Sequence, residues 1–381
     1  MLIPRPEHRT EEERHGPVPR PNVDTIRPYK PGKPIEQVVR ELGIKGTVDK
    51  LASNENPLGP SAKALAALRK ETKRLYMYPE DSCWVLREKL AKLHKVKMDR
   101  VLVGNGSVEL ILQACLAYLG PGDELVTSAG AFIMAKVGTM VAGARCVELP
   151  VKDYRHDLER MLEVTTERTK IVYIDNPVNP LGTMVTRKEL DKFIKQVPEH
   201  VLVILDEAYA EYITTRNYPN SLKYLKAGSN VLILRTFSKV YGLAGLRVGY
   251  GLAPAAIIET VGKVRLPFNV NRAAQVAATA ALDDHAHVNR SRKLVETGKK
   301  YLYDELKRLQ VFFIPSHTNF VLVNFPVDAR VVFEALQQRG VITRPVKQYG
   351  FPNALRVTIG TATQNKRFIK ALETVLKEIQ G

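Results

Sequence analysis

The 381-residue sequence is short of cysteine and has no long apolar run, and each shortage excludes a class of protein. The three cysteines, Cys83, Cys115 and Cys146, lack the paired spacing of a metal or redox site, so we expect structural thiols and no metal. No segment approaches the roughly 18 apolar residues that span a bilayer, and the N-terminus lacks the apolar core of a signal peptide. We therefore expect a cytoplasmic protein without a membrane partner.

Acidic residues are also scarce, because 40 Asp and Glu stand against 57 Lys and Arg, for a formal net charge of +17. A nucleic-acid-binding protein concentrates such charge in patches. Here the excess is scattered over predicted helical faces such as residues 63–74. We interpret it as solvated surface that favours small anionic ligands, and we expect no nucleic-acid partner.

The first 28 residues are rich in Pro, Arg and Glu and have almost no apolar periodicity, so we expect an extended or disordered N-terminal extension. We expect an N-terminal arm and small-domain segment over residues 29–75. A large domain over 76–283 and a small C-terminal domain over 284–381 complete the predicted organisation.

Short Val- and Ile-rich runs alternate with amphipathic segments from residue 101 onward, which is typical of a mostly parallel sheet covered on both faces. Strands of this sheet are expected at residues 101–103, 124–127, 145–149, 170–175, 201–206, 231–235 and 246–252. The C-terminal part predicts strands at 311–314, 320–324 and 355–359, with helices at 288–309, 331–338 and 366–379. The fold class is therefore α/β, with a smaller α+β domain at the C-terminus.

Ligands of parallel sheets collect at the carboxyl ends of the strands, so residues just past each predicted strand are candidates. Residues 104–109 lead through glycines into a helix start, which presents backbone N–H groups to a phosphate or is merely a tight connection. Residues 176–183 contain two Asn-Pro steps, and proline holds the residue before it in an extended conformation. This segment is either part of the site at the strand end or an ordinary turn. Asp206 ends an apolar strand, where a carboxylate meets a cation or caps a helix.

A lysine and an arginine follow the next predicted strand. Lys239 comes directly after Thr236 and Ser238, and we expect burial to lower the pKa of its amine, which makes a neutral nucleophile available for a carbonyl. Arg247 lies eight residues further on. Together the strand ends supply a lysine nucleophile, a carboxylate, hydrogen-bonding side chains and a phosphate cup in one layer.

This set of motifs resembles the fold-type I pyridoxal-phosphate (PLP) enzymes, the class I and II aminotransferases, over about residues 29–381. The matching motifs are Gly106-Ser107, Asn179-Pro180-Leu181-Gly182, Asp206-Glu207-Ala208-Tyr209, Ser238-Lys239 and Arg247. The resemblance implies pyridoxal 5′-phosphate as cofactor and a mostly parallel, seven-stranded sheet. It also implies that Lys239 carries the cofactor as a Schiff base and moves the substrate proton, and that Asp206 keeps the ring nitrogen protonated.

The same resemblance assigns the remaining cofactor contacts. Tyr209 and Asn179 would hydrogen-bond the phenolic oxygen, and Phe132 would stack on the ring, although a core position is an alternative. The phosphate would be bound by residues of two loops, Gly106, Ser107 and Val108 through their backbone and Thr236, Ser238 and Arg247 through their side chains. Tyr78 matches the tyrosine that reaches the phosphate of the partner subunit's cofactor, so we expect a homodimer.

Residues 28–36, 51–57 and 355–360 are similar to the histidinol-phosphate aminotransferases, which implies histidinol phosphate as amino donor and 2-oxoglutarate as acceptor. In that comparison Tyr29 and Asn179 contact the substrate, and Arg344 and Arg356 receive its anionic end. Arg344 can equally be a surface residue. The chain departs from that family at Val108, where an aspartate is usual, and at Ala135, which we expect to reshape the substrate side.

Two other enzyme activities and two non-enzyme functions are the alternatives. An aromatic amino acid aminotransferase and a threonine-phosphate decarboxylase share the same scaffold and motifs. A PLP-domain transcription regulator is disfavoured, because about 28 residues ahead of the fold leave no room for a helix-turn-helix module. A nucleic-acid-binding side function is still allowed by the charge.

Overall fold

The computed structural model describes residues 17–26, 28, 32 and 34–380. Its centre is a seven-stranded sheet of which β8 alone runs antiparallel to its neighbours. The strands in spatial order are β2 (Val101–Gly104), β8 (Gly249–Leu252), β7 (Val231–Thr236), β6 (Leu202–Asp206), β5 (Thr169–Asp175), β3 (Glu124–Ser128) and β4 (Arg145–Leu149). The expected α/β fold with a mostly parallel sheet is confirmed.

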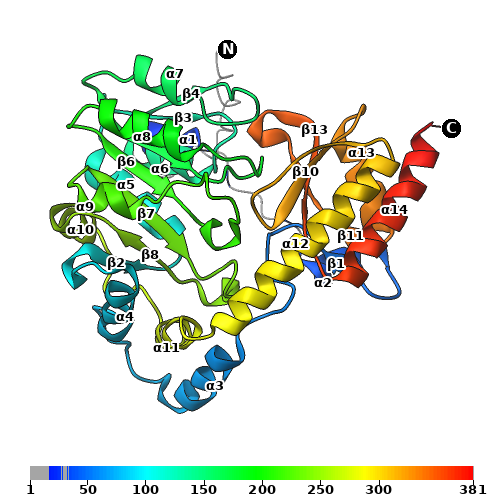
Figure 1. Cartoon of the computed structure of the whole chain (residues 1–381), viewed down its shortest axis with the longest axis horizontal. Helices are drawn as coiled ribbons and strands as arrows, with labels where there is room; N and C mark the ends of the chain where they lie inside the picture. Colours follow the sequence, from blue (N-terminus) through cyan, green and yellow to red (C-terminus); the bar gives the residue numbers. More distant parts are fainter. Residues whose placement is uncertain (1–16, 27, 29–31, 33, 381) are drawn as a thin grey trace.

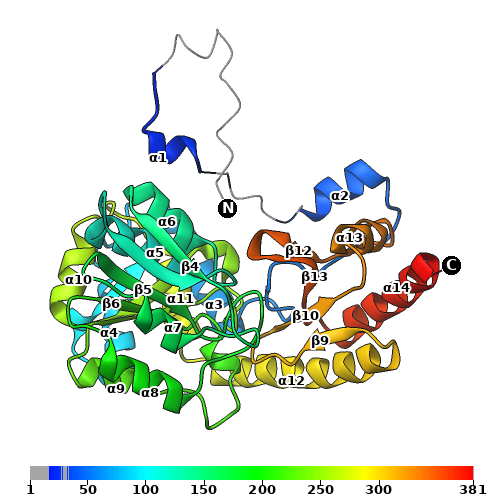
Figure 2. The ribbon, with the colours of Figure 1, turned by 90° about the horizontal axis from the view of Figure 1, so that it is seen from above.

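Helices cover both faces of this sheet because its strands are apolar on both sides. Along β5, Ile171 and Tyr173 pack against α5 (Ser107–Tyr118) and α10 (Ala255–Gly262), whereas Val172 and Ile174 belong to the core on the opposite face. That second core includes Leu190 and residues of α8 (Arg187–Gln196) and α9 (Leu222–Lys226). Figure 2 shows α5 and α6 (Met134–Ala142) on one face and α8 and α9 on the other.

The C-terminal part forms a smaller α+β body, drawn in orange and red in Figure 1. Its antiparallel sheet has the order β12 (Arg344–Val346), β13 (Phe351–Thr358), β10 (Phe320–Asn324) and β9 (Phe312–Ile314). The accompanying helices are α13 (Ala329–Gln338), α14 (Ala362–Gln380) and the long α12 (His285–Arg308), which leads from the large sheet to the small one.

The chain before residue 101 contributes to both bodies. A parallel pair joins β1 (Asp49–Lys50) to β11 (Val341–Ile342), near α2 (Ile35–Leu42) in the small body. By contrast, α3 (Ala62–Glu71) packs on α11 (Arg272–Ala281), and α4 (Trp84–His94) lies against β2. The domain limits at residues 75 and 283 stay predictions.

Three sequence expectations differ from the structure. Residues 21–24 form a helical turn, α1 (Pro21–Asp24), inside the segment expected to be extended or disordered; the Asn22 amide donates to the carbonyl of Met140 in α6 (2.7 Å), which anchors it. The strand expected from residue 246 begins only at Gly249, because Arg247 has a left-handed backbone (φ 55°). The helices α2, α9 and α10 were not expected, because their short apolar patterns fit several structures.

The described part of the chain contains no helix that is both long and apolar enough to cross a membrane. Cys83 and Cys115 are buried free thiols, and Cys146 is a partly buried one. Burial raises the pKa of each thiol to about 12. Thiols with such a pKa are poor nucleophiles and poor metal ligands at neutral pH, as expected of structural cysteines.

Candidate active site

A cavity of about 230 Å³ lies at the carboxyl ends of β5, β6 and β7. Three consecutive parallel strands therefore deliver their terminal residues to one place, as the strand-end rule predicts. The predicted site residues that line it are Ser107, Val108, Phe132, Asn179, Asp206, Tyr209, Thr236, Ser238, Lys239 and Arg247. The sequence expectation that these residues share one layer is met.

Lys239 lies three residues beyond the end of β7 and points its amine into this cavity. The amine donates to the carbonyl of Ser53 (3.3 Å) and lies over the ring of Tyr209, 5.6 Å from its centroid. Burial and the positive charge of Arg356 lower the pKa of Lys239 to about 8. A substantial neutral fraction is therefore available near neutral pH, as a nucleophilic amine requires.

Asp206 is the last residue of β6 and is only 4% exposed. Its carboxylate accepts from the Tyr173 hydroxyl (2.9 Å) and the Ala208 N–H (3.1 Å), and no α-helix begins there for it to cap. Burial, and then the charge of Asp175 on the neighbouring strand, raise the pKa of Asp206 to about 7. Such a carboxylate is stabilised by a cation brought into the cavity.

The cup expected for a phosphate lies where β2 passes into α5. Gly106 has a φ of +79°, and a Cβ there would come within 2.5 Å of the Arg247 guanidinium. A Cβ on Gly249 would come within 2.5 Å of the Ser107 backbone nitrogen. Glycine at both positions therefore lets Arg247 and the first N–H groups of α5 surround the same small volume, which suits a phosphate.

Side chains of the loop after β7 close the cup. Thr236 donates to the Ser238 hydroxyl (3.0 Å), and Arg247 donates to the Ser238 hydroxyl (3.4 Å) and to the Ala244 carbonyl (3.1 Å). Val108 contributes at the start of α5, where its backbone rather than its side chain is available to an anion. A valine at this position is therefore compatible with the cup.

Tyr209 and Asn179 line the cavity just beyond the ends of β6 and β5, and both are held by polar neighbours. The Tyr209 hydroxyl accepts from the Asn54 amide (2.9 Å), and its ring meets Phe320 edge-on. The Asn179 side-chain oxygen accepts from Arg356 (2.6 Å). Asn54 belongs to the family-like segment 51–57, but no sequence signal identifies it as the partner of Tyr209.

Arg356 is buried, with 8% of its surface exposed, and joins three parts of the chain. Besides Asn179, it donates to the Ala52 carbonyl (2.6 Å), and its guanidinium lies 5.4 Å from the centroid of Phe320. Its Nε is buried with no hydrogen-bond acceptor among the described residues. A buried guanidinium with an unused donor is well suited to an incoming anion.

Arg344 is the Cα partner of Arg356 across the β12–β13 pair, so both side chains leave the same face of the small sheet. It is half-buried rather than a surface residue, although it does not line the cavity. A Cβ on Gly32 would lie 3.8 Å from the Arg344 guanidinium, so Gly32 itself lies beside this arginine. Tyr29 itself lies outside the described residues.

Two predicted residues lie elsewhere. Tyr78 is 77% exposed, does not line the cavity, and stacks on Phe268 with ring centroids 4.6 Å apart. Ala135 is 1% exposed and packs in the core between α5, α6 and the sheet. The expectation that Ala135 reshapes the substrate side is therefore wrong, because its small side chain faces the core.

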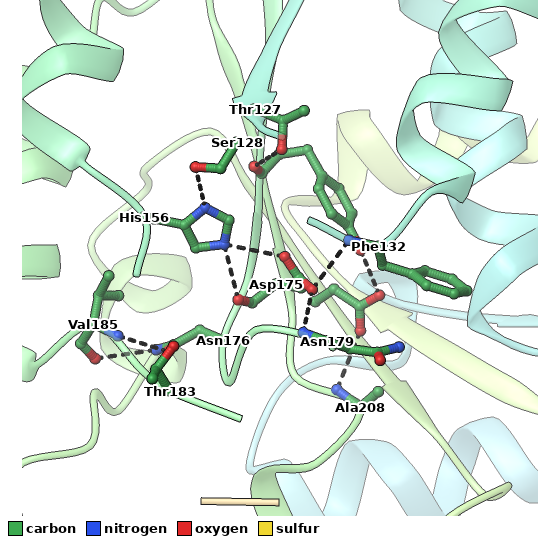
Figure 3. A network of polar contacts seen from close by, with 12 residues as sticks. Thr127, Ser128, Phe132, His156, Asp175, Asn176, Asn179, Thr183, Val185 and Ala208 are labelled. Carbon is green, nitrogen blue, oxygen red and sulfur yellow. Dashed lines mark hydrogen bonds and ion pairs between the residues drawn. The ribbon is translucent and has the colours of Figure 1, made fainter. Parts of the chain in front are cut away.

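Sequence reasoning missed a polar network beside the cavity, drawn in Figure 3. Asp175 ends β5 as Asp206 ends β6, and it accepts from His156 (3.0 Å) and from the backbone of Phe132 and Asn179. The strand-end rule offered a signal for Asp175. His156 had none, because it comes from the loop between β4 and α7 (Leu158–Glu163).

Comparison with known proteins agrees with this geometry. A profile of the family described as aminotransferase class I and II matches residues 47–372. The histidinol-phosphate aminotransferase of Moorella thermoacetica is 50% identical over 353 residues, which cover 92% of this chain and 91% of that protein. The histidinol-phosphate aminotransferase 2 of Pseudomonas fluorescens Pf-5 is 46% identical over 93% of this chain and 96% of that protein.

Solved structures agree in fold. The crystal structure of histidinol-phosphate aminotransferase from Sinorhizobium meliloti, in complex with pyridoxal-5′-phosphate, matches with a TM-score of 0.87 and 26% identity, and the match covers 94% of this chain and 97% of that one. An aspartate aminotransferase double mutant from Thermus thermophilus matches with a TM-score of 0.82 at 21% identity over 94% of this chain and all of that one, which concerns the fold alone. The motif order, the cavity and these matches establish that the chain belongs to the class I and II aminotransferases, enzymes of the fold-type I PLP group.

Proposed function

We propose that the chain is a PLP-dependent histidinol-phosphate aminotransferase that passes the amino group to 2-oxoglutarate. The observation that carries the proposal is one cavity holding the Lys239 amine and the Asp206 carboxylate, whose lining residue Asn179 accepts a hydrogen bond from Arg356. Arg344 is the partner of Arg356 across the β12–β13 pair. The names of the relatives at 50% and 46% identity support the same substrate.

The residues of the cavity fit pyridoxal 5′-phosphate. The cup formed by the start of α5, Ser238 and Arg247 suits the phosphate, and the lack of space for a Cβ at Gly106 keeps it open. The buried Asp206 suits a protonated ring nitrogen, since a cation there would offset the penalty that raises the pKa of this acid. Tyr209, Asn179 and Phe132 all line the cavity, which supports the proposal that Tyr209 and Asn179 would hydrogen-bond the phenolic oxygen and Phe132 would cover the ring.

When bound, the cofactor supplies an electron sink for the bond broken at the substrate Cα. The protein residues supply the proton handling. The amine of Lys239, with its pKa lowered to about 8, would accept the proton of the substrate Cα at Nζ and then release it again. Asp206 would keep a proton on the ring nitrogen, and the Asn54–Tyr209 hydrogen bond fixes the orientation of the tyrosine hydroxyl.

The two arginines explain the choice of a phosphate-bearing donor. A phosphate carries close to two negative charges and three acceptor oxygens, which suits two guanidinium groups better than a single carboxylate does. Arg356 is fixed by Asn179 and the Ala52 carbonyl, whereas Arg344 lies across the strand pair. In this proposal Tyr29, which lies outside the described residues, contacts the substrate.

We further propose a homodimer in which Tyr78 reaches the phosphate of the partner subunit's cofactor. Tyr78 is exposed and stacks on the exposed ring of Phe268. The segments that carry these two rings expose further large apolar side chains, and all are at least 42% exposed: Leu75, Tyr76, Tyr78, Trp84, Val85, Leu266 and Phe268. Exposed large apolar side chains support an interface between subunits.

The test of function is a half-reaction screen with the PLP form of the enzyme. Histidinol phosphate, phenylalanine, tyrosine and threonine phosphate are mixed with it separately, and conversion to the pyridoxamine form is followed by absorbance. We expect histidinol phosphate to react fastest. A faster reaction with phenylalanine or tyrosine would replace the proposal with an aromatic aminotransferase, and release of CO₂ from threonine phosphate would replace it with a decarboxylase.

The covalent site is tested separately. Borohydride reduction should fix the cofactor to the peptide that contains Lys239, as read by mass mapping. Lys239→Ala should bind PLP without a covalent bond and lose transamination by several orders of magnitude, because the nucleophile and the proton carrier disappear together. Labelling of another lysine would refute the assignment.

A further inference from the structure

Asp175 stands at the junction of two loops that carry cofactor residues. It is the last residue of β5, directly beside Asp206 in the parallel ladder, and 3% of it is exposed. One loop follows β3 and carries Phe132; the other follows β5 and carries Asn179. These two residues line different parts of the cavity and belong to segments more than 40 positions apart.

The Asp175 carboxylate ties these two loops together. Its Oδ2 accepts from the backbone N–H of Asn179 (2.8 Å) and from that of Phe132 (3.2 Å). Figure 3 shows both bonds converging on the same oxygen. A single side chain thus fixes the Phe132 backbone relative to the Asn179 backbone.

His156 fixes the carboxylate in turn. Its Nε2 lies 3.0 Å from Asp175 Oδ1 and 3.0 Å from the Asp175 carbonyl oxygen, and its Nδ1 lies 2.8 Å from the Ser128 hydroxyl. The carbonyl oxygen can only accept, so Nε2 carries a proton and donates, while Ser128 is free to donate to Nδ1. His156 and Ser128 are 5% and 1% exposed, so water does not compete for these bonds.

We propose that Asp175, oriented by His156, is a positioning residue of the cofactor cavity. The carboxylate sets the position of the Phe132 ring, which would cover one face of the planar cofactor, relative to the Asn179 amide, which would meet the cofactor's edge. This inference rests on the proposed function, because it takes PLP as the occupant of the cavity. Asp175 does not itself carry out the proton transfer assigned to Lys239.

Two substitutions of Asp175 distinguish the contribution of its acceptor oxygen from that of its negative charge. Asp175→Asn removes the charge but keeps an oxygen for the two backbone N–H groups, whereas Asp175→Leu is similar in shape and removes both. The measurement is the dissociation constant of PLP for the cofactor-free full-length protein, together with the visible circular dichroism band of bound PLP. That band reports how the cofactor is oriented and does not change with global stability alone.

We expect the leucine variant to bind PLP at least about 10-fold more weakly than the asparagine variant, a size usual for partners that orient a binding residue. We also expect a reduced dichroism band in the leucine variant alone. Equal binding by the two variants would overturn the inference, since charge would then account for any effect. The matched controls are Asp191→Asn and Asp191→Leu on α8, outside the cavity, which should both bind as the wild type does.

His156→Phe provides a second test that leaves Asp175 intact. Loss of the donor to Oδ1 should weaken PLP binding by roughly 3- to 10-fold at an unchanged far-ultraviolet spectrum, whether or not Asp175→Leu folds. Wild-type binding by His156→Phe would overturn the role of the pair. Failure of the wild-type protein to bind PLP would instead refute the proposed function, so the two failures are distinguishable.

Discussion

The buried carboxylate of Asp206 should make the cofactor-free protein less stable as the pH rises. Its pKa is about 7 in the folded chain against an ordinary value of 3.8, because burial and the charge of Asp175 disfavour ionisation. Between these two values the folded state binds more protons than the unfolded state, so the free energy of unfolding falls as the pH increases and stays low above pH 7. Asp206→Asn cannot ionise and avoids this loss.

The magnitude follows from the difference of about three pKa units. At 1.36 kcal/mol for each unit, the penalty on wild-type protein reaches about 4 kcal/mol above the folded pKa. At about pH 5 the penalty is only partly present. The free energy of unfolding of Asp206→Asn should therefore gain about 3 kcal/mol relative to that of wild type between about pH 5 and about pH 8. Urea unfolding of both cofactor-free proteins at the two pH values measures this difference.

The control is Asp99→Asn, which removes an exposed carboxylate and should change the free energy of unfolding by less than about 0.5 kcal/mol at either pH. Added PLP gives a second arm. It should stabilise wild type more than Asp206→Asn at about pH 8, because the variant offers no charge to the ring nitrogen. A stability difference between wild type and Asp206→Asn that does not change with pH would refute the account of Asp206 as an uncompensated buried acid.

Three further predictions concern the phosphate cup, the substrate and the dimer. Gly106→Ala places a methyl group within 2.5 Å of Arg247, so the dissociation constant of PLP should rise about 10-fold or more in a titration of the cofactor-free protein; an unchanged constant contradicts the cup. Arg344→Ala should lower kcat/KM for histidinol phosphate by about 30- to 150-fold and that for phenylalanine much less, and an equal loss for both donors argues against phosphate recognition. Tyr78→Phe should weaken PLP retention by about 1 to 2 kcal/mol, measured by dialysis, and a fully active monomer in gel filtration would exclude a shared site.

Much of the cavity could be predicted because parallel strands end at a common edge. The apolar runs identify one strand that ends at Asp206 and another that ends just before Lys239. Because the two strands are parallel neighbours, sheet geometry predicts that these two residues lie close together. The glycines before the helix start at Gly106 also offered a signal for the cup, because such a turn presents backbone N–H groups to a phosphate, but a tight connection fits the same pattern and only the structure separated the two. Such local patterns predict the residue at which a strand or helix ends and the position of the turn that follows.

Only the tertiary structure decided which polar side chains meet across distant segments. Asn54 contacts Tyr209 from 155 positions away, and Arg344 faces Arg356 through the register of two short strands. The sequence by itself determined the α/β class and the strand-end candidates, because burial imposes a periodic pattern. The Asp175–His156 pair depends on how two loops pack against each other. Hydrogen bonds between loops leave no periodic pattern in the sequence.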